Sequence, residues 1–310
     1  MIPINSSYLG GVDKSPCFSI RESDAIALKK IRLGIVKSWI KAIVREIIIT
    51  PNADDHKYSR GVLGIVTGSI NFPGAAVLSV SAANQTGIGM TRFYSPNKET
   101  GQLVLAKNPE VVTEPGLVDA FLLGSGIVEK NIFSTKRHRE LKQAAKLNLP
   151  TVLDAGAMFL AGKIEAPTII TPHYGELARL LNSRNHSCTV KDISENPEKW
   201  ARFAARKLGV NVLLKGNKTF VSDGVEVEEL PQATTFLATA GSGDVLAGIL
   251  GALVCSNRKR LSSQRVSLLE IGVGASFIHA QAALLASKHN SITASMIVNK
   301  IPKAIAKILD

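Results

Sequence analysis

The residues best suited to chemistry lie between Ala238 and Leu250, where small residues, two glycines and one carboxylate lead into an apolar helical pattern. Glycine permits positive φ and close backbone approach to a ligand, and the first N–H groups of a helix lack partners within it. Such a turn would suit a phosphate. Asp244 would stand in the first helical turn, where the helix dipole keeps it ionised and able to accept a proton from a hydroxyl. A tight turn with Asp244 as the helix N-cap is the alternative, and this stretch alone does not decide between them.

A second candidate is His173, which follows a short run of β-branched residues. Pro172 stiffens the approach to it and Gly175 the exit, while Glu176 would lie in the first turn of a short apolar helix. An isolated histidine is more often a surface or packed residue, but its place after a predicted strand favours contact with a ligand.

The segment Lys215-Gly216-Asn217-Lys218-Thr219 closes another predicted strand and opens a hairpin. The Lys215 amine and the Gly216 N–H would suit a nucleotide phosphate. Taken on its own, the segment is better explained as a charged β-turn, and the spacing of a Walker A loop occurs nowhere in the chain.

The turn at Gly68-Ser69, with the small residues that follow Pro73, predicts a second helix N-terminus with room for a flat ligand or for helix-on-strand packing. Ser69 lacks the GxSxG pattern of a serine nucleophile. His279 lies in an apolar helical pattern and is interpreted as packed rather than reactive.

The elements that must position these residues alternate between strand and helix. We expect strands at 61–66, 117–123, 151–153, 168–170 and 210–214, and helices at 23–45, 74–84, 133–147, 245–255, 268–286 and 294–309. This order predicts an α/β fold in three layers, with a mainly parallel central sheet and helices on both faces. Because ligands bind beyond the carboxyl ends of such strands, the candidate residues should meet at one edge. We expect an N-terminal extension over 1–50 and one domain over 51–310.

Composition excludes several classes of protein. The chain has 310 residues and a net charge of +12, but its basic residues are dispersed and aromatic residues make up only 5%, which argues against nucleic acid and suits a small polyanion. Three distant cysteines predict neither a disulfide framework nor a zinc site. No run approaches the roughly 18 uncharged apolar residues of a membrane span, and no leader pattern opens the chain, so we expect no membrane partner and a cytoplasmic location.

Taken together, the motifs resemble those of the NAD(P)H-hydrate dehydratase family, which has the ribokinase-like fold. The resemblance runs from about His56 to the C-terminus and is carried by TPHxGE, KG and AGSGDVLAG, in the order of the family. The motifs begin at Thr171, Lys215 and Ala240, and Gly68-Ser69, Pro73-Gly74-Ala75 and Gly124-Ser125-Gly126 precede them.

This resemblance implies a hydro-lyase that returns the S epimer of NADHX or NADPHX to NADH or NADPH, with ADP as co-substrate and Mg²⁺ as cofactor, whose ligands remain unknown. ADP would end as AMP and phosphate. It implies that the hydrate contacts Ala75, Gly126, His173 and Asp244, with Asp244 as catalytic base, and that the nucleotide contacts Lys215, Gly216, Asn217, Lys218, Thr219 and Gly243. A separate NAD(P)HX epimerase is the expected functional partner, and a homo-oligomer, with a tetramer as one option, the expected assembly.

The chain departs from the family pattern at two places. It reads Asp154-Ala155-Gly156 where members usually have Asp-Ala-Asp, and Ser125 and Val128 replace Pro and Gly in a GPGLG loop. The alternative function is a ribokinase-like kinase that phosphorylates a vitamin-precursor alcohol, although such kinases tend to lack the loop with His173. A third hypothesis, a basic nucleic-acid or nucleotide-sensing protein, leaves Asp244 without a role.

Overall fold

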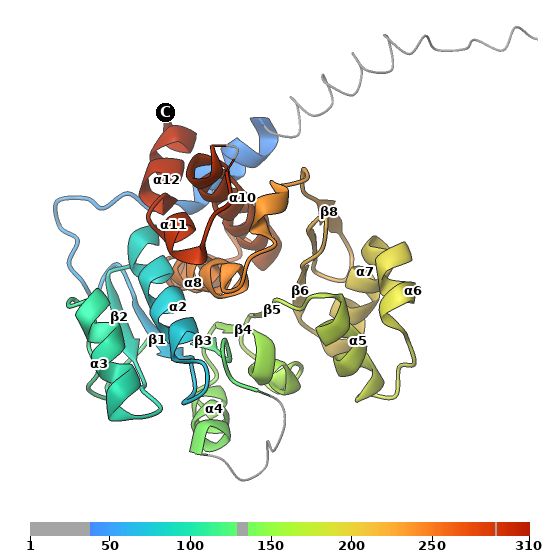
Figure 1. Cartoon of the computed structure of the whole chain (residues 1–310), viewed down its shortest axis with the longest axis horizontal. Helices are drawn as coiled ribbons and strands as arrows, with labels where there is room; N and C mark the ends of the chain where they lie inside the picture. The colour runs from blue at the N-terminus through green and yellow to red at the C-terminus, as the bar shows by residue number, and fades with distance from the viewer. Residues whose placement is uncertain (1–37, 129–135, 289) are drawn as a thin grey trace, which may run out of the picture.

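The computed structural model describes residues 38–128, 136–288 and 290–310, and these form one eight-stranded sheet with helices on both faces (Figure 1). The spatial order is β2-β1-β3-β4-β5-β6-β7-β8. Strands β1 to β6 all pair in parallel, while β7 and β8 are added as antiparallel hairpin strands. The three-layer α/β architecture expected from the sequence is confirmed.

The strands are short and lie close to the expected positions. They are β1 Val62–Val66, β2 Met90–Phe93, β3 Ala120–Leu123, β4 Thr151–Leu153, β5 Thr168–Ile170, β6 Asn211–Leu214, β7 Phe220–Ser222 and β8 Val227–Glu229. Strand β3 starts later than the expected 117, because Leu117 is 92% exposed and the chain joins the sheet only after Asp119. Strands β2 and β8 were not expected, since both mix polar and apolar residues without a clear period.

The helices account for most of the remaining described residues. They are α2 Pro73–Thr86, α3 Lys98–Lys107, α4 Lys136–Lys146, α5 Tyr174–Asn182, α6 Val190–Glu195, α7 Pro197–Leu208, α8 Ser242–Ser256, α9 Arg258–Ser262, α10 Leu268–Ser287, α11 Ala294–Val298 and α12 Ile301–Leu309, with 3₁₀ turns η1 Ala155–Leu160 and η2 Thr235–Leu237. The single helix expected over 294–309 is wrong, because the chain breaks at Asn299 and restarts with Pro302 in the first turn of α12.

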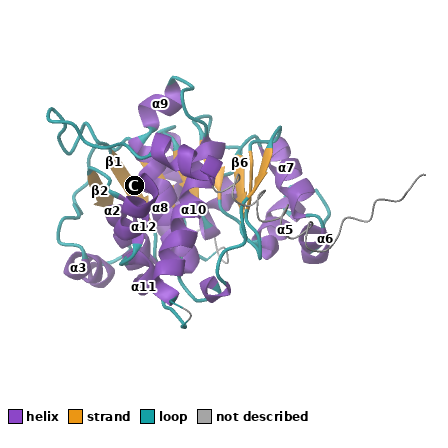
Figure 2. Ribbon diagram, turned by 90° about the horizontal axis from the view of Figure 1, so that it is seen from above, coloured by secondary structure: helices purple, strands orange, loops and turns teal. Residues whose placement is uncertain are grey.

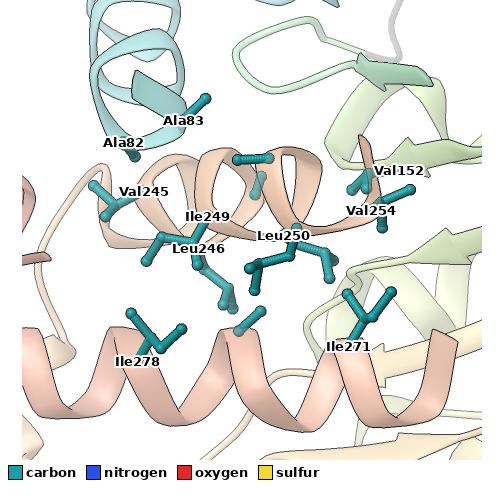
Figure 3. Close-up of a cluster of buried hydrophobic side chains, with 14 of the residues drawn as sticks. Ala82, Ala83, Val152, Val245, Leu246, Ile249, Leu250, Val254, Ile271 and Ile278 are labelled. Atoms are coloured by element: carbon teal, nitrogen blue, oxygen red, sulfur yellow. The ribbon is translucent and has the colours of Figure 1, made fainter. Parts of the chain in front are cut away.

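The helices form two layers around two apolar cores. Helices α2, α8 and α10 contact one face of the sheet, and α4 and α7 contact the other. In the view of Figure 2, α5, α6 and α7 lie beside β6, away from β1 and β2. Figure 3 shows the side chains of Leu246, Ile249 and Leu250 on α8 between Ile271 and Ile278 of α10 and the α2 helix. Because α8 is packed along its whole length, its first turn is held at a fixed position above the strand ends.

Helix α10 is long and apolar enough, by length and composition, to cross a membrane. This differs from the expectation that no run approaches the length of a membrane span. However, 72% of its most apolar window is buried inside the protein. Its apolar character is therefore explained by its place between α8, the sheet and the helix at 38–47.

That helix is the described end of the segment expected at 23–45, whose residues up to 37 lie outside the described part. Ile40, Val44 and Ile47 are buried in the same core as α8 and α10. A Cβ atom on Gly274 of α10 would approach Ile47 Cδ1 to 2.2 Å, so this glycine permits the close packing. Residues 38–47 thus contribute directly to the core of the domain.

Candidate active site

The first turn of α8 combines a glycine-lined backbone with one carboxylate. Gly241 is the N-cap with φ of +85°, a left-handed conformation that favours glycine, and the chain enters the helix at Ser242. No side chain caps the helix, so Asp244 is a first-turn residue and the N-cap alternative is wrong. The first N–H groups of α8 therefore retain their capacity to bind an anion.

Asp244 faces a cluster of charged groups from three other elements. The Lys215 ammonium, at the end of β6, lies 3.2 Å from Asp154 Oδ1 and 3.9 Å from Glu176 Oε2. A Cβ atom on Gly243 would lie 3.5 Å from the same ammonium. One lysine thus lies among three carboxylates, so its charge is already compensated before any ligand binds.

The pKa of Asp244 is raised from 3.8 to about 7, first by burial and then by the negative charges of Asp154 and Glu176, against the opposing effect of Lys215. The expectation that the helix dipole keeps this carboxylate ionised is corrected: burial and like charges outweigh it. For Lys215, burial acts to lower the pKa, but attraction to Asp154, Glu176 and Asp244 raises it overall. Asp244 is therefore a carboxylate whose proton affinity suits a general base near neutral pH.

His173 is the N-cap of α5. Its Nδ1 accepts hydrogen bonds from the N–H groups of Gly175 at 3.1 Å and Glu176 at 3.3 Å, while Glu176 Oε2 accepts the His173 N–H at 2.8 Å. The side chain is 55% exposed, and its Nε2 lies 3.6 Å from Glu176 Oε2. The Lys215 N–H donates to Pro172 O at 2.8 Å, which joins this loop to the end of β6.

Ala75 in the first turn of α2 and Gly126 in the loop after β3, the other residues expected at the hydrate, lie in contact. A Cβ atom on Gly126, which has φ of +68°, would approach the Ala75 methyl group to 2.4 Å. The Gly68 N–H donates to Ser125 O at 2.7 Å, and Ser69 Oγ donates to Gly126 O at 2.8 Å. Strand β1 lies between β2 and β3 in the sheet, so these loops follow the point where the strand order reverses, which is where α/β sheets commonly bind ligands.

Arg137, on α4, supports the turn after β1, a role that was not indicated by the sequence. It is buried, and its guanidinium donates to the carbonyls of Thr67, Gly68 and Tyr94. The basic pattern around it resembles a solvated helix face, and nothing in the sequence distinguishes it from the neighbouring lysines and arginines. Its contacts fix the turn after β1 from the opposite side of the sheet.

A cavity of about 450 Å³ lies between the end of β6 and the start of α8. Lys215, Gly216, Asn217, Thr219 and Gly243 line it, as do residues of the 232–238 connection. Lys218 does not line the cavity; its ammonium pairs with Glu229. Five of the six residues expected at a nucleotide therefore border one cavity.

His279 also borders this cavity, although the sequence indicated only a packed residue. It is 7% exposed, lies against the backbone of Ser242, and its Nε2 has no hydrogen-bond partner within the described part of the protein. Burial lowers the pKa of His279 to about 4, so the ring is neutral near the positive end of α8.

Among residues 38–128, 136–288 and 290–310, no group of three histidine, cysteine, aspartate or glutamate side chains is arranged to hold a metal ion. The described part of the chain therefore shows no complete set of protein ligands for Mg²⁺. Since Mg²⁺ in phosphoryl-transfer sites is held largely by substrate phosphates and water, an ion entering with a nucleotide would not require such a set.

The fold and this site define a ribokinase-like α/β protein in which a glycine-lined helix start carries a partly buried carboxylate. The solved structure of a ribokinase-like superfamily protein from Enterococcus faecalis has the same fold, with a TM-score of 0.71 and 21% identity over 86% of this chain and 94% of that one. The ADP/ATP-dependent NAD(P)H-hydrate dehydratase from Bacillus subtilis, co-crystallised with ATP and Mg²⁺, gives a TM-score of 0.73 and 23% identity over 87% of this chain and 98% of that one.

A family model described as NAD(P)H-hydrate dehydratase matches residues 63–307, and the chain belongs to this family. A bifunctional NAD(P)H-hydrate repair enzyme from Corynebacterium glutamicum is 32% identical over 289 residues, covering 83% of this chain and 49% of the relative. An ATP-dependent (S)-NAD(P)H-hydrate dehydratase from Batrachochytrium dendrobatidis is 27% identical over 303 residues, covering 82% and 93%. The chain spans about half the length of the bifunctional relatives it matches.

Proposed function

We propose that this protein dehydrates the S epimer of NADHX or NADPHX to NADH or NADPH, with ADP converted to AMP and phosphate. The observation that carries the proposal is Asp244: a partly buried carboxylate with a pKa of about 7, on the glycine-lined start of α8, beside a cavity of about 450 Å³. Family membership gives the class of substrate.

The chemistry needs a better leaving group than hydroxide. Asp244 takes the proton of the hydrate hydroxyl, whose oxygen attacks the terminal phosphoryl group of ADP and releases AMP. N–H groups around Gly241 to Gly243 stabilise the charge of the transferred group. The lone pair of the ring nitrogen then expels phosphate, and loss of a proton from the neighbouring ring carbon restores the dihydropyridine. Hydrate and ADP thereby become reduced cofactor, AMP and phosphate.

The proposed ligand contacts follow two walls of the site, a hydrate wall formed by Ala75, Gly126 and His173 and a nucleotide wall formed by residues 215–219 and Gly243. The hydrate lies against Ala75, Gly126, His173 and Asp244, which is supported by the contact between Ala75 and Gly126 and by the exposure of the His173 side chain. The nucleotide lies along residues 215–219 and Gly243, which is supported by the cavity there. The ammonium of Lys215 pairs with Asp154. We therefore assign the contact between this segment and the nucleotide phosphates mainly to backbone N–H groups.

Mg²⁺ is proposed as a cofactor that neutralises charge on the nucleotide phosphates. ADP is the proposed co-substrate, and ATP is the competitor to test, since relatives are described as ATP-dependent or ADP/ATP-dependent. An epimerase remains the proposed functional partner, and a cytoplasmic homo-oligomer the proposed state.

The test mixes purified protein with synthetic hydrate, Mg²⁺ and either ADP or ATP, and follows the return of reduced-cofactor absorbance together with AMP and phosphate. We expect recovery with ADP and AMP formation in equal amount. Recovery with ATP alone would replace ADP in the proposal. No recovery with either nucleotide, combined with phosphorylation of a vitamin-precursor alcohol such as hydroxyethylthiazole, would establish the kinase alternative instead.

A further inference from the structure

The carboxylate of Asp154 has no ligand contact in the roles proposed so far, yet it accepts hydrogen bonds from three side chains of the site. It is 4% exposed at the end of β4. Its Oδ2 accepts from Ser125 Oγ at 2.8 Å, and its Oδ1 accepts from Thr171 Oγ1 at 2.7 Å and from Lys215 Nζ at 3.2 Å. These three donors follow three different strands, β3, β5 and β6.

Each donor belongs to a loop with a separate task. Ser125 precedes Gly126 and accepts the Gly68 N–H through its carbonyl, so it shapes the proposed hydrate wall. Thr171 begins the loop that carries His173. Lys215 begins the segment that lines the proposed nucleotide cavity. One buried carboxylate thus connects the two walls of the site.

We propose that Asp154 is a positioning residue: its carboxylate holds Ser125, Thr171 and Lys215 in place, and so fixes the hydrate wall, the nucleotide wall and the charges that face Asp244. This inference rests on the proposed function for its consequence in turnover, and on the hydrogen bonds of Asp154 for its mechanism. A buried charge with three donors keeps one arrangement, because any displaced donor would leave it incompletely paired.

The electrostatics point the same way. The groups that face Asp244 are Asp154 from β4, Glu176 from α5 and Lys215 from β6, and the nearby His279 of α10 is neutral. Asp154 and Glu176 raise the pKa of Asp244, whereas Lys215 lowers it. Removing the charge of Asp154 and removing that of Lys215 should therefore move the pKa of Asp244 in opposite directions, a pattern that lost packing alone does not produce.

The experiment follows the carboxyl ¹³C resonances of aspartate-labelled protein through a pH titration, with Asp244→Asn used to identify the Asp244 signal. Asp154→Asn should lower the apparent pKa of Asp244 by about one unit, and Lys215→Met should raise it by about one unit. The control is Asp119→Asn, at the opposite end of the sheet, where the carboxylate accepts the Val62 N–H at 2.8 Å and pairs with Arg258 at 3.0 Å. It should leave the Asp244 titration in place. Shifts of the same sign in Asp154→Asn and Lys215→Met, or none, would overturn the proposal.

A second variant covers the case in which Asp154→Asn does not fold. Ser125→Ala removes one donor to Asp154 without touching the nucleotide cavity, which Ser125 does not line. It should weaken ADP binding, measured by calorimetry, about threefold through Asp154. An unchanged ADP affinity would contradict the proposal. Neither measurement needs the hydrate, so a protein that failed to regenerate NADPH would refute the proposed function without deciding the role of Asp154.

Discussion

Replacing Asp244 by Asn should abolish turnover and, at the same time, make the folded protein more stable at alkaline pH. The pKa of Asp244 is raised in the folded state from 3.8 to about 7, chiefly by burial. Between these two values the folded protein holds a proton that the unfolded chain has released. The free energy of unfolding therefore falls as pH rises through this window, and the loss is complete above the folded pKa.

The magnitude follows from the size of the shift. Each unit corresponds to about 1.4 kcal/mol, so a shift of about three units destabilises the wild-type protein by up to about 4 kcal/mol at about pH 8. At about pH 5 this destabilisation of the wild-type protein amounts to only about 1.5 kcal/mol. Asn cannot ionise, so the stability advantage of Asp244→Asn over wild type should grow by roughly 2.5 kcal/mol between these two conditions.

Urea unfolding at several pH values, followed by circular dichroism, measures this difference directly. Taking the difference between variant and wild type at each pH cancels the titration of the groups that do not interact with Asp244. Asp119→Asn removes a carboxylate at the opposite end of the strands, where it pairs with Arg258, and serves as the matched control. An advantage of Asp244→Asn that stays constant from acid to alkaline pH would refute the reasoning, and with it the assignment of Asp244 as a base tuned by its surroundings.

Three further outcomes follow from the same geometry. In wild type, kcat/KM for the hydrate should rise tenfold per pH unit below about pH 7 and level off above it, as one carboxylate loses its proton; a pH-rate profile checks this. Gly126→Ala should weaken hydrate binding at least about tenfold, because the added methyl collides with the Ala75 methyl at 2.4 Å, whereas Gly209→Ala, with a similar φ of +64° and open space, should affect only stability; calorimetry with the synthetic hydrate, without ADP, separates them. Arg137→Lys should lower the unfolding free energy by about 2 kcal/mol and raise KM for the hydrate more than that for ADP, because the compact ammonium of lysine cannot span the separate carbonyls that the guanidinium fork reaches; denaturation and steady-state kinetics test both.

Much of the fold and part of the site follow from local sequence patterns. The buried strands β1, β4 and β5 are continuous apolar or β-branched runs that end in a polar or glycine residue, which is the pattern of parallel strands covered on both faces. The start of α8 can also be predicted from local sequence, because glycines precede residues with an apolar helical period. Strand β2 could not be recognised, because Thr91 and Arg92 interrupt its apolar pattern and its place is set by pairing with β1.

The chemistry of the site could not be predicted in the same way, because it depends on contacts between distant residues. Asp154 and Lys215 are separated by 61 positions, yet their pairing decides where the ammonium points. The pKa of Asp244 depends on that pair and on Glu176 from a third element. His279 shows the same limit: its spacing correctly indicates burial, but nothing in α10 alone reveals that it borders a cavity formed by the 232–238 connection.

The two departures from the family pattern are physically linked. A Cβ atom on Gly156 would lie 2.3 Å from the backbone oxygen of Ile127, so the loop after β3 occupies the space that an aspartate at this position would need. The same loop carries Ser125, whose hydroxyl donates to Asp154 at 2.8 Å, a bond that the proline usual in the family cannot make. In this chain the carboxylate of Asp154 accepts hydrogen bonds from the side chains of Ser125, Thr171 and Lys215. Restoring an aspartate at position 156 alone should therefore push the Ile127 segment outward and loosen the contact between Gly126 and Ala75, rather than recover the family arrangement.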